Sequence, residues 1–366
     1  MKRHVRDRPL RAHEARNHET DRSTEHALSY RAPRWLAGGH AQTIWPYRLR
    51  RPAVPLRRQR IDTPDNDFWI FDWLDMPAAP DAPLVVLFHG LEGGSDSHYA
   101  RALMLALSRA GWRGVVAHFR GCGGEPNRLP RAYHSGDHEE VGAMLAAIRG
   151  LVPPLPLYAV GVSLGGSALL NWLGRAGADA SGVLRAAAAV SAPLDLMAAG
   201  VAIGRGLNRI YTAHFLASLK PKSLAIAKHF PGILDASKIR RARTMWQFDD
   251  VVTAPLHGFS GAGDYWTRAS SKSWLARIAI PTLVINARND PFIPAHSLPT
   301  PAEVSPCITL EQPRHGGHAG FAAGRFPGHV NWLPARLLHY FQSVGNAQHP
   351  STLPDSNHSG RRHASR

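Results

Sequence analysis

The sequence predicts an α/β fold with a mostly parallel central sheet flanked by helices and a helical cap insertion. Short apolar runs alternate with helical stretches over most of the 366 residues, which is the order expected of strand–helix–strand crossovers. The runs are almost wholly apolar, as strands buried on both faces are. Between about residues 194 and 275 the pattern is helical, without convincing strands. We therefore expect one domain with an inserted cap.

The first two strands are expected to form an antiparallel hairpin at the opening edge of the sheet, over residues 56–61 and 68–74, because both stretches alternate. A mixed segment at 35–46 precedes them. The later strands are expected within residues 84–90, 114–121, 157–163, 186–193, 281–290 and 307–312. Helices are expected near residues 98–110, 136–149, 165–175 and 328–344.

Basic residues gather near the ends of the chain. Residues 1–34 hold nine Lys or Arg against five Asp or Glu, residues 47–60 hold six Arg, and residues 346–366 hold three Arg and one Asp. Such an excess is typical of solvated, partly disordered arms. We expect a disordered basic arm over 1–34, one α/β domain over 35–345 with its cap at about 194–275, and a disordered tail over 346–366.

The composition also restricts partners and location. No zinc spacing or recognition-helix pattern accompanies the basic charge, so specific nucleic-acid binding is not expected, although weak peripheral contact with an anionic membrane is compatible with it. Two cysteines are too few for a disulfide framework and suit a reducing compartment. No apolar run approaches the ~20 residues of a membrane span or forms a secretory signal. We expect a cytoplasmic protein, and the oligomeric state stays open.

The strongest motif is Gly161-Val162-Ser163-Leu164-Gly165, a G-x-S-x-G at the junction of an apolar strand and a helix. Small residues on both sides allow the chain to reverse sharply and present the serine hydroxyl in a cleft. The motif also occurs by chance in glycine-rich turns, but its position between a strand and a helix favours a nucleophile. We therefore predict that Ser163 is the catalytic nucleophile.

A serine hydroxyl needs a base, and the base needs a partner that fixes its tautomer. Asp290 follows an apolar strand directly, at the strand end where open α/β sheets build their sites. His318 lies in a glycine-rich loop between the last strand and the last helix, and His315 is a rival in the same loop. The order Ser163, Asp290, His318 is that of α/β-hydrolases. We predict these three as the catalytic triad and His315 as structural.

The oxyanion formed by attack on an ester carbonyl requires preorganised N–H donors. One donor is expected to be the backbone N–H of Leu164, the residue after the nucleophile. The other is expected from the glycine-rich turn at residues 89–94, which can bring the Leu91 N–H close to the serine. The alternative for that turn is a simple strand-to-helix connection.

Five segments together resemble one known family. They are HGLEGGSDSHY at 89–99, HFRGCGGEPNRLPRAYHSGD at 118–137, GVSLGGSALLNWLG at 161–174, NARNDPFIP at 286–294 and HGGHAGF at 315–321. The chain resembles, over most of residues 32–342, the YheT-like branch of the α/β-hydrolases, which includes plant embryogenesis-associated and animal membrane-associated hydrolase-domain relatives. The resemblance implies carboxylesterase activity, the triad Ser163, Asp290 and His318, and an oxyanion hole at Leu91 and Leu164.

The segment at 118–137 is expected to form a tight loop beside the cleft, shaped by Arg120 and its glycines. We expect Asp137 to cap the helix that follows. Cys122 has no base adjacent in sequence, so a structural role is favoured over a nucleophilic one.

The predicted function is hydrolysis of carboxylic esters through an acyl-enzyme on Ser163, with acylglycerol or short-chain lipid esters among the candidate substrates. No cofactor or metal is required, and the histidines show no metal-ligand spacing. Two alternatives stay open: a thioesterase, amidase or carbon–carbon bond hydrolase on the same triad, and a catalytically silent ligand-binding protein. We expect the cap to form the acyl pocket.

Overall fold

The computed structural model describes residues 29–49 and 52–348. Eight strands form one sheet in the order β1-β2-β4-β3-β5-β6-β7-β8. Their bounds are β1 Leu56–Asp62, β2 Phe68–Leu74, β3 Leu84–Phe88, β4 Arg113–His118, β5 Leu157–Val162, β6 Ala186–Val190, β7 Thr282–Ile285 and β8 Ile308–Glu311. Strands β1 and β2 form an antiparallel pair, β2 runs antiparallel to β4, and the remaining neighbours are parallel. The expected fold class and edge hairpin are confirmed.

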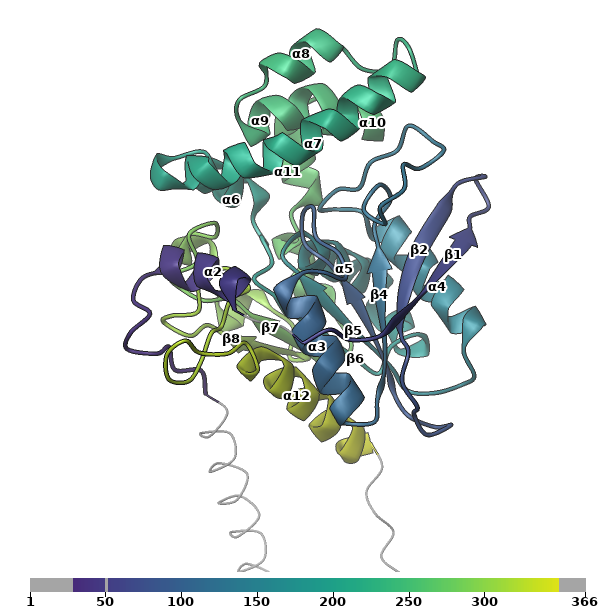
Figure 1. Ribbon diagram of the computed structural model, residues 1–366, viewed down its shortest axis with the longest axis vertical. Helices are drawn as coiled ribbons and strands as arrows, with labels where there is room; N and C mark the ends of the chain where they lie inside the picture. Colours follow the sequence, from purple (N-terminus) through teal and green to yellow (C-terminus); the bar gives the residue numbers. More distant parts are fainter. Residues whose placement is uncertain (1–28, 50–51, 349–366) are drawn as a thin grey trace, which may run out of the picture.

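Two layers of helices cover the sheet, as Figure 1 shows. Helices α3 (His98–Arg109) and α12 (Trp332–Gln348) cover one face, and α4 (His138–Leu151) and α5 (Leu164–Ala176) cover the other. Successive residues of β3 therefore enter different cores, because side chains alternate along a strand. Val85 and Leu87 pack with α3 and α12, and their neighbours pack with α4 and α5. The strand sequence is apolar throughout because both faces are buried.

The chain between β6 and β7 is helical and lies beyond one end of the sheet in Figure 1. Its α-helices are α6 Leu196–Ile203, α7 Arg209–His229, α8 Ala236–Arg241, α9 Met245–Phe248, α10 Ala254–His257 and α11 Ala262–Ala269. A single π-helical turn, Asp249–Thr253, joins α9 to α10. Two short 3-10 turns belong to this segment, Gly206–Asn208 and Lys272–Arg277. Other 3-10 turns lie outside it, at Gly177–Gly182, Ala295–Ser297 and Pro301–Glu303. Leu216, Ile239, Phe248 and Val252 belong to a small core within this segment, which we call the cap.

The ends of the described chain differ in part from the sequence prediction. Most of the predicted basic arm and tail lies outside the described residues, so the predicted domain boundaries stay predictions. Residues 56–60 of the second basic stretch form part of β1, where arginines occupy a sheet edge and discourage pairing with another chain. The last helix begins at Trp332, not near 328, because a β-bridge between Ala323 and His329 holds the preceding backbone extended.

One substitution tests the packing of the last helix. Leu337 on α12 is 2% exposed and packs in the core between the sheet and helices α3 and α12, whereas Leu151 at the end of α4 is 44% exposed. We expect Leu337→Ala to lower the free energy of unfolding by about 2–5 kcal/mol, because it removes buried apolar contacts and leaves a cavity. Leu151→Ala should change it by less than about 1 kcal/mol. Urea denaturation followed by circular dichroism measures both, and equal losses would contradict the packing described.

Candidate active site

Ser163 occupies a strained turn between β5 and α5. Its φ is 53° and its ψ is −122°, a conformation that costs a non-glycine residue about 1–3 kcal/mol and is found at nucleophile elbows. A Cβ on Gly165 would lie 2.5 Å from the carbonyl oxygens of Phe88 and His89, and one on Gly161 would lie 2.5 Å from the Gly165 oxygen. A side chain at either position would collide with backbone atoms, so both positions require glycine. Small residues on both sides of Ser163 were predicted from the motif.

The structure brings the three predicted triad side chains together. The Ser163 Oγ lies 2.9 Å from Nε2 of His318, and Nδ1 of His318 lies 2.8 Å from Oδ2 of Asp290. A carboxylate can only accept, so Nδ1 carries the proton that it donates to Asp290, and Nε2 is left to accept from the serine hydroxyl. The other oxygen of Asp290 accepts from the Phe292 N–H at 2.8 Å, which fixes the carboxylate. The rival His315 is exposed, with Nδ1 3.5 Å from the side-chain nitrogen of Asn289.

The two predicted oxyanion donors flank the serine. Leu164 is the first residue of α5, and Leu91 follows Gly90, on which a Cβ would lie only 3.0 Å from the Cβ of Ser163. Neither the Leu91 nor the Leu164 N–H donates a hydrogen bond to any residue within 29–49 or 52–348. Both donors therefore remain available to a developing negative charge beside Ser163.

A buried histidine shapes the turn before Leu91. Nε2 of His89 accepts from the Phe119 N–H at 3.1 Å, so its Nδ1 is protonated and donates to the Gly90 oxygen at 2.8 Å. Burial, and then the nearby charge of His118, lower the pKa of His89 to about 3. His89 is therefore a neutral ring that positions the turn. No role for His89 was predicted from the sequence, although its place at the end of β3 beside a glycine-rich turn is a usable signal.

Helix α2 (Gly39–Arg48) holds the loops that carry the acid and the histidine. Thr43 Oγ1 accepts from the His318 N–H at 2.9 Å. The buried Gln42 Oε1 accepts from the Gly316 N–H at 2.8 Å and from the Asn289 side chain at 2.9 Å. Neither the helix nor the role of these two side chains was predicted, because Gln42 and Thr43 belong to no catalytic motif.

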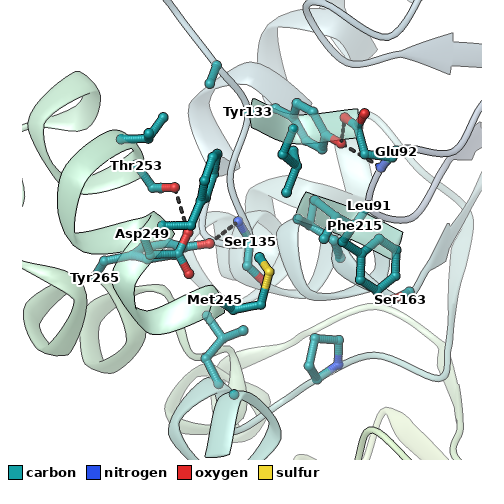
Figure 2. Close-up of a pocket in the computed structure, with 18 of the residues that line it drawn as sticks. Leu91, Glu92, Tyr133, Ser135, Ser163, Phe215, Met245, Asp249, Thr253 and Tyr265 are labelled. Atoms are coloured by element: carbon teal, nitrogen blue, oxygen red, sulfur yellow. Dashed lines mark hydrogen bonds between the residues drawn. The ribbon is translucent and has the colours of Figure 1, made fainter. Parts of the chain in front are cut away.

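A cavity of about 180 Å³ extends from the serine into the cap. Figure 2 shows Ser163, Leu91 and the cap residue Phe215 at one side of it and the cap residues Asp249, Thr253 and Tyr265 at the other. Apolar side chains supply much of its lining, among them Leu196, Ile203, Phe215, Leu219, Met245 and Phe248. This lining is suited to an apolar group next to the serine.

An ion pair joins the cap to the turn that carries Leu91. Nζ of Lys222 on α7 lies 2.9 Å from the Glu92 carboxylate. Glu92 also donates its N–H to the Tyr133 hydroxyl at 2.6 Å and accepts from that hydroxyl at 3.0 Å. The Cys122 sulfur lies 3.9 Å from both charged groups, and burial raises its pKa to about 11. Cys122 is therefore a thiol at neutral pH, which agrees with the structural role expected for it.

The loop at residues 118–137 is tied down by buried charges. The Arg120 guanidinium contacts Glu140 on α4 at 2.7 Å and Asp67 beside β2 at 3.1 Å, and Arg120 also lines the cavity. The expectation that Asp137 caps α4 is wrong for its side chain. Asp137 sits at the N-cap position but makes no capping hydrogen bond, because its carboxylate instead accepts from Arg131 at 2.7 Å.

Two further properties concern the part of the chain that the structure describes. None of its helices combines the length and apolar character needed to cross a membrane. No group of three or more His, Cys, Asp or Glu side chains there is arranged to hold a metal ion.

Comparison with known proteins places this fold and site in a family. The family model for the alpha/beta hydrolase fold matches residues 83–324. The chain is 38% identical over 309 residues to "Putative esterase YheT" of Escherichia coli (strain K12), covering 83% of this chain and 90% of that protein. It is 30% identical over 319 residues to "Phospholipase ABHD3" of Mus musculus, covering 85% and 77% respectively.

Among solved structures, the Pyrococcus furiosus esterase Pf2001 aligns with a TM-score of 0.51 at 16% identity, covering 80% of this chain and 91% of that one. At this identity the likeness shows the fold alone. The chain belongs to the α/β-hydrolase family, and within it to the YheT-like branch that the sequence motifs predicted. The family and these relatives support a hydrolase.

The role of α2 is testable through the reactivity of the serine. We expect Gln42→Leu to slow labelling of Ser163 by a fluorophosphonate by about 10- to 100-fold, because displacing the loop before His318 misaligns the base. Gln342→Leu, an exposed position on α12, is the matched control and should label at the wild-type rate. Labelling with a fluorescent fluorophosphonate is stopped at a series of times, and the fluorescence of the protein band on a gel gives the labelling rate of each variant. Equal rates for the two variants would show that α2 does not position the histidine loop.

Proposed function

We propose that the protein is a serine carboxylesterase that cleaves carboxylic esters through an acyl-enzyme on Ser163. The observation that carries the proposal is the continuous hydrogen-bonded line from Asp290 through His318 to Ser163. The Leu91 and Leu164 N–H groups, which no acceptor among the described residues binds, belong to the turns on either side of the serine. A binding protein has no need for a nucleophile, a base, an orienting acid and an oxyanion site in one place.

The first stage of the reaction is acylation. Ser163 Oγ attacks the ester carbonyl carbon while Nε2 of His318 takes its proton, and Asp290 stabilises the imidazolium. The Leu91 and Leu164 N–H groups stabilise the negative charge on the former carbonyl oxygen. When the tetrahedral intermediate collapses, His318 returns the proton to the alkoxide, and the alcohol leaves.

The second stage releases the acid. A water molecule, deprotonated by His318, attacks the acyl carbon and forms a second oxyanion. Collapse breaks the bond to Ser163 Oγ, which recovers its proton from His318. Every proton passes through His318, so the scheme uses no cofactor or metal.

The cavity and the relatives favour an ester of a fatty acid as substrate. The lining between Ser163 and the cap is largely apolar, which suits an alkyl chain more than a charged acyl group. One relative is named as a putative esterase and another as a phospholipase. These names support the ester class for this chain and do not identify the alcohol.

Turnover of a chain-length series tests the proposal. Wild-type protein should hydrolyse p-nitrophenyl esters, and Ser163→Ala should lose at least about 10⁴-fold in kcat because the acyl-enzyme cannot form. Ser167→Ala, on the buried face of α5, serves as a serine control that leaves the nucleophile intact. The absorbance of the released p-nitrophenolate measures each rate. Matched thioester and amide substrates complete the panel, and a folded wild-type protein with no ester turnover would contradict the proposal.

A further inference from the structure

The cavity ends in the cap in a group of polar side chains that the ester chemistry does not use. Figure 2 shows Asp249, Thr253 and Tyr265 together on the side of the pocket away from Ser163. Asp249 and Thr253 belong to the π-helical turn, Tyr265 to α11, and the nearby Ser135 to the loop before α4. All four line the cavity. Isolated π-helical turns occur frequently at functional sites.

Asp249 places a carboxylate at an otherwise apolar end of the cavity. It is 7% exposed, one oxygen accepts from the Thr253 hydroxyl at 2.6 Å, and the other accepts from the Trp266 indole N–H at 2.7 Å. Each carboxylate oxygen can accept a further hydrogen bond. Burial raises the pKa of Asp249 to about 6, so the group is charged in most molecules at neutral pH. If this end of the cavity held only an alkyl chain, the chain would supply no hydrogen bond to the buried carboxylate, and the cost of removing that charge from water would be offset only by Thr253 and Trp266.

Two hydroxyl groups beside Asp249 also lack complete partners. The Tyr265 hydroxyl accepts from the Ser135 N–H at 3.1 Å, but no described residue accepts its proton. The Ser135 hydroxyl is buried and has no hydrogen-bond partner in the described chain. Burial, and then the charge of Asp249, raise the pKa of Tyr265 well above its usual value, so the phenol keeps its proton. The end of the cavity thus presents an acceptor and two hydroxyl donors.

We propose that this end of the cavity binds a hydroxyl group carried on the acyl chain of the substrate, remote from the ester bond. A hydroxyl group donates one hydrogen bond and accepts others, which matches the free acceptor of Asp249 and the free donors of Tyr265 and Ser135. A plain alkyl chain would leave all of them without partners. The inference rests on the proposed function and names its substrate class: esters of hydroxy fatty acids.

The consequence is selectivity between two substrates that differ by one oxygen. A site built to bond a substrate hydroxyl discriminates strongly against the analogue that lacks it, because its buried polar groups are then unpaired. We expect a preference of about tenfold or more in kcat/KM for a hydroxyacyl ester whose hydroxyl reaches Asp249. The preference should depend on the position of the hydroxyl along the chain.

The test compares p-nitrophenyl octanoate with a set of p-nitrophenyl hydroxyoctanoates in which the hydroxyl moves outward one carbon at a time. In wild-type protein at least one hydroxylated ester should be preferred. Asp249→Asn should lower that ratio of kcat/KM severalfold. The asparagine oxygen can still accept from Trp266 and its amide can donate to Thr253, so the local contacts survive, while the negative charge is lost and the acceptor on the Thr253 side becomes an N–H donor. Ser135→Ala should reduce the ratio in the same direction.

Asp250→Asn is the matched control, because Asp250 is exposed on the same turn and does not line the cavity. It should keep the wild-type ratio. Calorimetric binding of ethyl octanoate and ethyl hydroxyoctanoates to Ser163→Ala repeats the comparison without turnover. This inference is overturned if p-nitrophenyl octanoate is hydrolysed as fast as every hydroxylated ester and the ethyl esters bind equally well. The proposed esterase activity would still stand. Binding selectivity without any turnover would support the hydroxyl site and contradict the esterase.

Discussion

The hydrogen bond between Ser163 and His318 depends on how firmly two loops are held at one edge of the sheet. Asp290 and His318 lie in the loops that follow β7 and β8, and these loops have no regular secondary structure around the site residues. Helix α2 provides the restraint, because Gln42 and Thr43 bond both loops. The histidine loop also packs closely against α2, because a Cβ on Gly320 would lie 2.0 Å from the backbone carbonyl oxygen of Gln42. The geometry of the base therefore depends on a helix that lies far from it in sequence.

The sheet positions the turns around Ser163, and the cap forms most of the cavity. Parallel strands bring their carboxyl ends to one edge, where the turns after β3 and β5 bring Gly90, the residue before Leu91, close to Ser163. The cap closes over this edge and supplies most of the apolar lining of the cavity. Lys222 links the two parts through Glu92, one residue from Leu91, the proposed oxyanion donor. This ion pair connects a helix that lines the cavity to the turn that carries the proposed donor.

The sequence predicted the features that depend on local pattern. Buried parallel strands are continuous apolar runs, and the elbow at Ser163 needs glycines at fixed spacing, so both were found. The roles of Gln42 and Thr43 could not be found, because their partners are about 250–275 positions away and no periodicity records such contacts. Asp249 was missed because a carboxylate in a helical segment usually faces solvent. The side chain of Asp137 was assigned to a helix cap, but a nearby arginine binds it more strongly than a backbone N–H would.

We propose that His318 activates Ser163 in preference to every other hydroxyl or thiol of the chain. Peptide mapping by mass spectrometry after treatment with a limiting amount of fluorophosphonate is the direct test. We expect one modified residue, Ser163, and loss of that adduct in a folded His318→Asn variant. An adduct on another residue, or an adduct on Ser163 that forms equally fast without His318, would show that His318 does not activate Ser163.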